Sequence, residues 1–366
     1  MKKTGTANLP LHGGKAPPWL FQRMIKLAGG ISAVIIDEYS QQELLNRLAD
    51  PYWFQAFGCV LGFDWHSSGL TTTVTGALKE GIDSQELGIA VCGGKGRASR
   101  KAQTEIKEQG EAFSLSSRSI DALKYSSRMS AKVDSAAVQD GYNLYHHAFF
   151  FDEKGKWSVV QQGMNPGNRY ARRYHWTSVN LESFVSEPHN AVCCDKRTKE
   201  ALNMTAKDSR GAQGISLDLI NDSPDKLRKY FTKQSTLSDF SGFKSLNMPR
   251  THFIINMNQR NLETLKKAHD FQPQNYEELL SIRNIGPKSV RALALVSEII
   301  YGKTPSWHDP VKYSFSHGGK DGIPYPVDRD IYDKSIEMLQ TGIQQAKLGN
   351  KDKLNALKRL NTFTGF

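Results

Sequence analysis

Cysteine is scarce in this chain, and long apolar runs are absent from it. Only 4 of its 366 residues are cysteine, too few for the disulfide framework on which small secreted domains depend. No stretch reaches the roughly 18 consecutive apolar residues that suggest a membrane-spanning helix. The first residues, MKKTGTANLPLHGG, carry lysines but no apolar segment like that of a secretory signal. We therefore expect a cytoplasmic protein without a membrane partner.

Signatures of common metal and nucleotide sites are missing as well. Neither HExxH nor CxxC spacing occurs, and the adjacent Cys193 and Cys194 have no second pair at metal-ligand spacing. The Gly-Gly-Lys-Gly turn at 93–96 lacks the first glycine and the Ser or Thr of a Walker A phosphate loop. It does follow a predicted buried strand and precedes a basic segment at 97–101, as an anion-binding turn would.

What the chain does contain is positive charge, concentrated in one half. The formal net charge is +11. Residues 1–195 hold 21 Lys and Arg against 19 Asp and Glu, whereas residues 196–366 hold 27 against 18. The second half carries most of the excess, which favours a partner rich in phosphate.

The clearest motif in the basic half is a pair of helices joined by a glycine turn. Asn275 followed three residues later by Glu278 is a helix-start signature. The pattern breaks at Gly286, and Pro287 opens a second helix that ends near Gly302. Bare amide groups at the start of that second helix would form an anion site.

Residues 275–302 resemble the helix-hairpin-helix family, through the order helix, Ile-Gly-Pro-Lys-Ser, helix. Members of this family grip the DNA backbone without reading its sequence. The resemblance implies DNA contacts from Arg283, Ile285, Gly286, Lys288, Ser289 and Arg291. The alternative is an ordinary helical hairpin with a solvated lysine.

A further resemblance lies at residues 322–339, where GIPYPVDRDIYDKSIEML is similar to the helix-hairpin-helix DNA glycosylases. In those enzymes a Pro-Val-Asp segment presents its aspartate to the sugar of a flipped base. The resemblance implies a catalytic role for Asp328 and a Schiff-base role for Lys288. The sequence departs from the pattern, because 40 residues separate these two positions and Asp330 stands where a histidine is usual. A DNA N-glycosylase or lyase is therefore an alternative function.

The first 195 residues predict a mixed α/β domain. Apolar spacing and turn signals predict helices over 23–50, a strand-like aromatic run over 50–75, a strand at 88–92, helix over 101–139, and a strand hairpin at 145–151 and 157–162. Strand signals cease near residue 196. We therefore expect an α+β fold, with a mixed α/β catalytic domain at 1–195 and an all-α DNA-binding domain at 196–366.

Histidines and aspartates gather on or beside the predicted strands. Asp64 and His66 stand two residues apart, so on a strand both side chains leave one face. Asp140 and His146 bracket the start of the next strand. Such ligands suit Mg²⁺, Mn²⁺ or Zn²⁺, which can activate water for phosphodiester cleavage. This hypothesis makes Asp64, His66 and His146 metal ligands and, with Asp140, the catalytic residues; the alternative is that the histidines are ordinary core or surface groups.

A basic and aromatic segment, NPGNRYARRYHW, occupies residues 165–176. Arg172 and Arg173 alternate with tyrosines in a pattern that suits stacking on unpaired bases while the arginines meet phosphates. A basic loop with its aromatic side chains in the core is the other interpretation.

Segments along nearly the whole chain resemble an uncharacterised prokaryotic family, domain of unknown function 763. They include TGTANLPLHGGKAPPWL, GFDWHSSG, VDSAAVQDGYNLYHH and HGGKDGIPYPVDRD. The resemblance implies an intracellular prokaryotic protein and supplies no activity. Our leading hypothesis is a DNA-repair hydrolase, a metal-dependent nuclease that holds DNA by the hairpin. A glycosylase or lyase and a non-catalytic DNA-binding protein are the alternatives.

Overall fold

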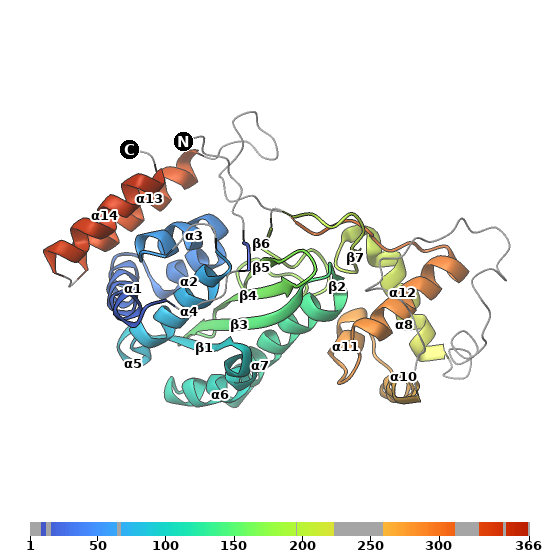
Figure 1. Cartoon of the computed structure of the whole chain (residues 1–366). Coiled ribbons are helices and arrows are strands. Elements are labelled where there is room, and N and C mark those ends of the chain that lie inside the picture. Colours follow the sequence, from blue (N-terminus) through green and yellow to red (C-terminus); the bar gives the residue numbers. More distant parts are fainter. Residues whose placement is uncertain are drawn as a thin grey trace.

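An antiparallel sheet with helices on both of its faces forms the centre of the molecule (Figure 1). The computed structural model describes residues 9–11, 16–63, 67–194, 196–222, 259–311, 329–346 and 349–364. In this part the strand order is β1-β3-β4-β5-β6. The strands span Ile89–Lys95 (β1), Asn143–Asp152 (β3), Trp157–Asn165 (β4), Tyr170–Thr177 (β5) and Ala191–Cys193 (β6). A second, two-stranded sheet pairs β2 (Val138–Gln139) with β7 (Leu202–Asn203).

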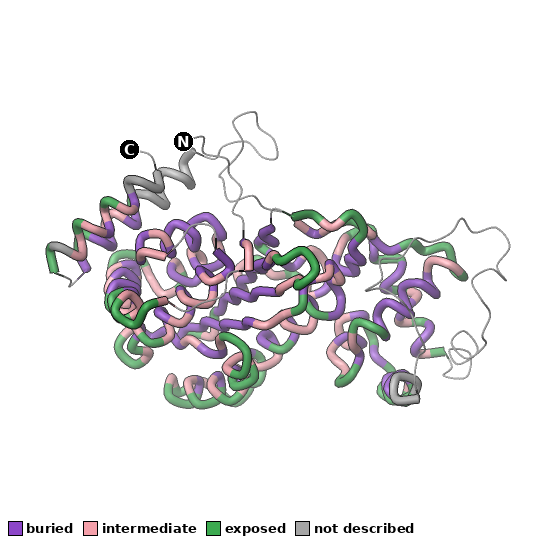
Figure 2. Tube along the Cα trace, in the orientation of Figure 1, coloured by how far each residue is buried: buried purple, intermediate pink, exposed green. Residues whose placement is uncertain are grey.

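The hairpin of β3 and β4 confirms the strand pair expected at 145–151 and 157–162. Its turn closes on Asp152, whose Oδ1 accepts the backbone N–H groups of Lys154 at 2.9 Å and Lys156 at 2.8 Å. Gly155 supplies the positive φ, 78°, that the turn needs. Because the central strands are buried on both faces (Figure 2), their apolar and polar side chains must all find partners inside.

Helices from both ends of the chain cover one face of the sheet. They are α1 (Pro18–Glu38), α2 (Gln41–Ala49), α3 (Pro51–Val60), α4 (Gly69–Gly81), α13 (Arg329–Gln345) and α14 (Asn350–Thr364). Their apolar side chains join Phe150 and Val160 of the sheet in one buried cluster. Gly29 of α1 and Gly81 of α4 let the two helices touch, since a Cβ on Gly29 would meet the Gly81 carbonyl oxygen at 2.2 Å.

Two helices replace the strand-like run expected over 50–75, so that expectation is wrong. Asp50 caps α3 by accepting the N–H groups of Tyr52 at 2.8 Å and Trp53 at 3.1 Å, and Pro51 takes the first helical position. Nearly all of α3 is buried, so its aromatic residues show no polar face from which a helical period could be detected. The helices expected over 23–50 are confirmed as α1 and α2.

One described helix, α1, is long and apolar enough by length and composition to cross a membrane. The buried core helix of a soluble protein passes the same test. Met24, Leu27 and Ile31 of α1 are buried in the cluster on the sheet. The cytoplasmic location stays a prediction.

The remaining helices cover the other face of the sheet or lie beyond its end, beside β2 and β7 (Figure 1). They are the 3-10 turn η1 (Gly96–Lys101), α6 (Ala102–Ala112), α7 (Ser117–Lys132), the π-helical turn η2 (Val133–Ala137), α8 (Arg210–Asp222), α10 (Gln259–Phe271), α11 (Tyr276–Ser281) and α12 (Pro287–Tyr301). The short helices α5 (Ser84–Leu87) and η3 (Lys207–Ser209) lie in connections. The helix expected over 101–139 is confirmed as α6 and α7, with η2 at its end.

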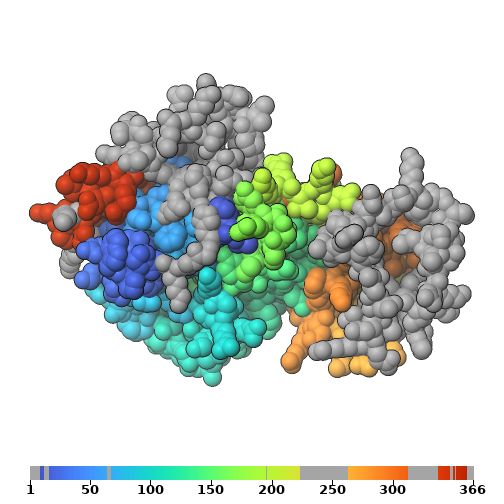
Figure 3. All heavy atoms as spheres, in the orientation of Figure 1, coloured from blue at the N-terminus to red at the C-terminus, as the bar shows by residue number. Residues whose placement is uncertain are grey.

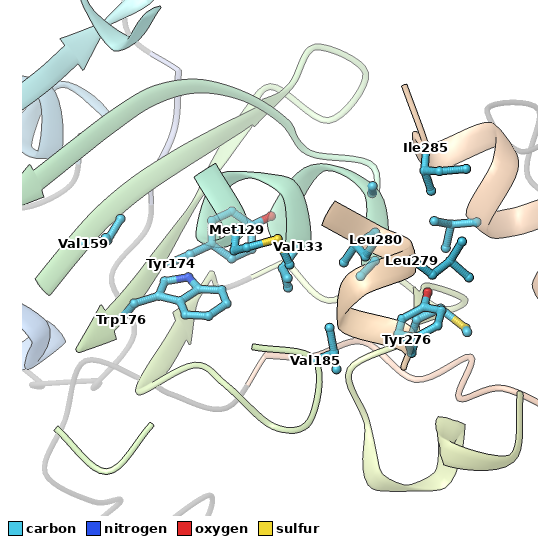
Figure 4. Close-up of a cluster of buried hydrophobic side chains, with 14 of the residues drawn as sticks. Met129, Val133, Val159, Tyr174, Trp176, Val185, Tyr276, Leu279, Leu280 and Ile285 are labelled. Carbon is cyan, nitrogen blue, oxygen red and sulfur yellow. The ribbon is translucent and has the colours of Figure 1, made fainter. Parts of the chain in front are cut away.

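The apolar core on this second face runs across residue 196. Figure 4 shows Trp176 of β5 and Val133 of η2 in the same cluster as Leu280 of α11 and Ile285. On the first face, α13 and α14 pack on α1 and α3. The mixed α+β class is thus confirmed, whereas β7 places a short strand beyond residue 196. The described residues show no break in packing there, and a functional division between the two halves stays a prediction.

Candidate nucleic-acid interface

The paired helices α11 and α12 form where the sequence predicted them. Asn275 caps α11, because its Oδ1 accepts the Glu278 N–H at 2.8 Å. A five-residue turn leads to Gly286, the extended residue before Pro287, and no side chain caps α12. Gly302 ends α12 in the left-handed conformation with φ 66°. We call this unit the α11–α12 hairpin.

The turn of the hairpin buries its apolar residue and presents its polar ones. Ile285 is fully buried, whereas Arg283, Asn284 and Lys288 are exposed. Asn284 reaches the left-handed region at φ 73°, which turns the chain back towards α12. Within the described contacts, the first amide of α12 with a helical partner is that of Val290, which donates to the Gly286 carbonyl at 3.0 Å. The backbone amides before that of Val290 have no carbonyl acceptor within α12, as at the start of any α-helix.

Side chains from α7 and β2 hold the hairpin against the apolar core on the second face of the sheet. Lys132 donates from Nζ to the Ile282 carbonyl at 3.2 Å. Gln139 donates from Nε2 to the Pro287 carbonyl at 2.8 Å and accepts from Arg291 Nε at 2.7 Å. The turn is therefore held on both sides of Gly286, a geometry that preorganises its amides and cations.

Three of the predicted contact residues do not present their side chains to solvent. Ile285 is fully buried, Ser289 is 2% exposed and Arg291 is 5% exposed. Burial lowers the pKa of Arg291 to about 10. Arg291 is therefore corrected from a DNA contact to a group that holds the hairpin on Gln139. Ile285, whose N–H donates to the Ile282 carbonyl at 3.2 Å, and Ser289 are likewise corrected from DNA contacts to buried residues of the hairpin.

Arg172, which the sequence assigned to phosphate contact, is fully buried. Its guanidinium donates to Asp140 and to Asp309, both at 2.8 Å, and lies 4.4 Å from the centre of the Tyr142 ring. The neighbouring carboxylates raise its pKa well above the usual value despite burial. Arg172 is therefore corrected from a DNA contact to a member of a buried ion pair. Its position in β5 directs its side chain towards the apolar core on the second face of the sheet.

Arg173 is fully buried on the opposite face of the sheet. It donates to Gln55 Oε1 at 3.0 Å and to Thr71 Oγ1 at 3.3 Å, and it lies 4.7 Å from the centre of the Phe54 ring. Successive residues of a strand leave opposite faces, so the run that suggested a basic surface in fact serves two cores. Arg173 is likewise corrected from a DNA contact to a buried structural group.

The four residues proposed for metal-dependent catalysis do not come together in the part that the structure describes. His146 bonds Thr75 Oγ1 at 3.0 Å on the first face, whereas Asp140 accepts from Arg172 and from Tyr174 at 2.8 Å on the second. Asp64 and His66 lie outside the described residues. No group of three or more His, Cys, Asp or Glu among the described residues could hold a metal ion. Asp140 and His146 are thus corrected to groups with separate internal partners.

Of the two residues in the glycosylase hypothesis, Lys288 and Asp328, the structure describes only Lys288. Lys288 is exposed at the start of α12, whereas a catalytic Schiff-base lysine is usually desolvated. Asp328 lies outside the described residues. The exposure of Lys288 fits a cation on the protein surface better than a desolvated catalytic amine.

The sequence matches the family described as a protein of unknown function, DUF763, over residues 5–327. The chain is a member of this family. No curated protein and no solved structure matches it.

Sequence reasoning missed a buried polar network beneath the sheet of the DUF763 protein. Asp134, in the π-helical turn, accepts from His189 Nε2 at 2.5 Å, Gln161 Nε2 at 2.6 Å and Trp176 Nε1 at 3.0 Å. Gln161 in turn bonds His147 Nδ1 at 2.8 Å. Burial raises the pKa of Asp134, and the contact with His189 opposes that shift.

The only sequence signal for this network is weak. His147 and Gln161 lie at cross-strand positions of β3 and β4 that share one face, but their partner Asp134 is recruited from a helix end. The Asp134 and His189 side chains are 0% and 1% exposed, and in the described part of the chain no fully buried side-chain nitrogen or oxygen of the network lacks a partner. The network therefore fixes the sheet to η2, on which the α11–α12 hairpin rests.

Proposed function

We propose that this DUF763 protein binds the DNA backbone through the α11–α12 hairpin. The observation that carries the proposal is the turn itself. Arg283 and Lys288 are exposed on either side of Gly286, beside helix-start amides that have no partner among the described contacts. A phosphate placed there could accept hydrogen bonds from the backbone and meet two cations.

The anchoring of the turn supports this function over that of an ordinary helical hairpin. Lys132 and Gln139 bond the carbonyl groups of Ile282 and Pro287, so the backbone is held in place through its carbonyl oxygens and not through its amides. A rigid donor loses little entropy when a ligand binds. The contact is with phosphate, so binding is expected to be independent of base sequence and strongly dependent on salt.

The test is duplex binding by the double variant Arg283→Ala/Lys288→Ala, measured by fluorescence anisotropy across a salt series. Removal of two phosphate contacts should make the plot of log K against log salt less steep, by about 1.8 in slope. It should also weaken duplex binding by up to about 60-fold near 0.1 M salt. The matched control is Lys154→Ala/Lys156→Ala, which removes two exposed cations from the β3–β4 turn. Equal slopes for the two variants would rule the hairpin out as the binding site.

Catalysis by this protein stays a separate proposal. Asp64, His66 and Asp328 lie outside the described residues, so neither the metal-dependent nuclease nor the glycosylase draws support from the described geometry. A DNA-binding role needs none of these residues. Nicking assays with and without a chelator distinguish the nuclease from simple binding.

A further inference from the structure

We propose that the DNA path extends from the α11–α12 hairpin along α7 to the glycine-rich turn after β1. This inference rests on the proposed function and names a longer contact surface for it. We call the surface the basic track, made of Lys95, Arg97, Arg100, Lys101, Arg128, Lys132, Arg283 and Lys288. Its ligand is the sugar-phosphate backbone of duplex DNA.

The far end of the basic track is a compact group of cations. Lys95, Arg97, Arg100 and Lys101 are all exposed, and none of them forms an ion pair within the described part of the chain. The segment from Ile89 to Thr104 contains no Asp or Glu. Four exposed positive charges on one short segment create a local positive potential that attracts anions.

The backbone beneath these cations is held in one shape. Gly93 has φ 87°, and a Cβ on it would meet the His147 carbonyl oxygen at 2.2 Å. The Gly93 N–H donates to Glu105 Oε2 at 2.7 Å, and Lys79 Nζ donates to the Gly93 carbonyl at 2.9 Å. Lys79 also pairs with Glu105 at 2.7 Å. The carboxylate of Glu105 is therefore paired with Lys79, and it holds the turn.

Helix α7 connects this turn to the hairpin. Gln103 donates to Ser127 Oγ at 3.2 Å, which places the start of α6 against the middle of α7. Arg128, the next residue, is exposed. Lys132 lies one helical turn further, and its pKa is lowered by burial and then by the charge of Arg128. Lys132 bonds the Ile282 carbonyl in the hairpin turn, so α7 contacts the start of α6 at one point and the hairpin at another.

Two carboxylates near α7 form contacts with other groups. Glu277 accepts from the Tyr125 hydroxyl at 2.8 Å and from the Phe184 N–H at 3.4 Å. Asp121 lies 3.4 Å from Lys124. Glu277 places an acid on the α11 side of α7, so we assign the path to α7, η1 and the hairpin turn. Figure 3 shows the cyan and teal atoms of η1 to α7 and the orange atoms of the hairpin on one face of the molecule.

The length of the basic track suits several phosphates of one strand. The rise of α7 from Ser127 to Lys132 is about 7 Å, and each crossing to a neighbouring element adds about 9 Å, so the track extends on the order of 25 Å. Phosphates of one strand advance about 3.4 Å each along the duplex axis, so about seven fall along this distance.

The choice of duplex over single-stranded DNA follows from the aromatic residues. Single-stranded DNA is usually held by bases stacked on exposed aromatic rings. The exposed large apolar side chains in the described part of the chain are Trp19, Tyr39, Phe271, Ile300, Tyr301 and Leu354. None of them belongs to η1, α7 or the hairpin turn, so the track offers cations without stacking platforms.

The test compares three double variants that each remove two exposed cations. They are Arg97→Ala/Arg100→Ala in η1, Arg283→Ala/Lys288→Ala in the hairpin and Lys154→Ala/Lys156→Ala as the control. Each is titrated with a duplex of about 20 base pairs over a salt series, after circular dichroism has shown that it is folded. The η1 and hairpin variants should each lower the salt slope by about 1.8, and the control should not. The single variant Arg128→Ala should lower it by about 0.9.

Each outcome supports or overturns a defined statement. If only the hairpin variant changes the slope, the basic track is wrong and the proposed function stands. If only the η1 variant changes it, both are wrong, because the hairpin then makes no contact. If neither changes it, the protein does not hold DNA in this way. Tighter binding to single-stranded than to duplex DNA would overturn the choice of ligand.

Discussion

Mild acid should destabilise this fold, because several histidines are buried in the uncharged form. His146 has Thr75 beside Nε2 and no partner at Nδ1 within the described contacts. His147 lies between Ser127 at 2.9 Å and Gln161 at 2.8 Å. His175 faces the Leu48 carbonyl at 3.0 Å. None of these partners in the described part of the chain is a carboxylate that could stabilise an imidazolium.

Burial dominates the pKa of all three groups. It lowers the pKa of His146 to about 3, with help from the charges of His147 and Lys95. It lowers the pKa of His147 to about 4, although the Gln161 hydrogen bond opposes the shift. Burial and then the charge of Arg173 lower the pKa of His175 well below its usual value. All three should stay neutral in the folded protein down to at least about pH 5.

The sign follows from proton linkage. An unfolded histidine takes up a proton below about pH 6.5, and the folded one does not, so stability is complete above that pH and falls as pH decreases towards the folded pKa. Between pH 7 and pH 5 each histidine should cost about 2 kcal/mol, and the three together about 6 kcal/mol. That approaches the whole stability of many domains, which is about 5–15 kcal/mol. The raised pKa of Asp134 acts in the opposite direction, so a single-site comparison is needed.

The assay is urea unfolding at pH 7 and pH 5 of wild type and His147→Gln. Gln can replace some of the hydrogen bonds and cannot take up a proton, so the variant should lose about 2 kcal/mol less than wild type between the two pH values. His308→Gln, at an exposed position, is the control. An equal acid loss in wild type and His147→Gln would refute the reasoning, because His147 would then not differ between the folded and unfolded states.

Two further changes test the internal contacts that support the candidate interface. Asp140→Ala should cost about 3–5 kcal/mol in urea unfolding, because it removes one of the two carboxylates that pair with the buried Arg172 and the acceptor of the Tyr174 hydroxyl. Gly93→Ala should lower the free energy of unfolding by at least about 2 kcal/mol, because the new Cβ would meet the His147 carbonyl oxygen at 2.2 Å. Its control is Gly96→Ala, where φ is also positive at 59° but nothing lies within 4 Å, so only the backbone strain of about 1 kcal/mol should appear.

The parts that the sequence predicted well are those encoded by neighbouring residues. The caps at Asn275 and Gly302 and the proline at 287 fix the ends of α11 and α12 through contacts over a few residues. The β3–β4 hairpin is likewise set by its turn around Asp152. Local signals of this kind stay valid whatever the rest of the chain does.

The parts that it predicted badly depend on distant partners. The α3 helix is nearly all buried, so its aromatic run resembles a strand. Arg172 pairs with Asp309 across 137 positions, and Asp134 with His189 across 55. Residue type alone placed Arg172 on a DNA surface, and only the three-dimensional contact places it in the core.

This distinction changes how the net charge of +11 should be used. Arg172, Arg173 and Arg291 are almost fully buried and cannot meet a phosphate. The exposed cations of η1 lie in the half of the sequence with a balance near zero, yet the fold brings them alongside α7 and so towards the basic hairpin. Affinity for DNA should therefore follow the arrangement of exposed cations on the basic track, and a change of net charge elsewhere should leave the salt slope unchanged.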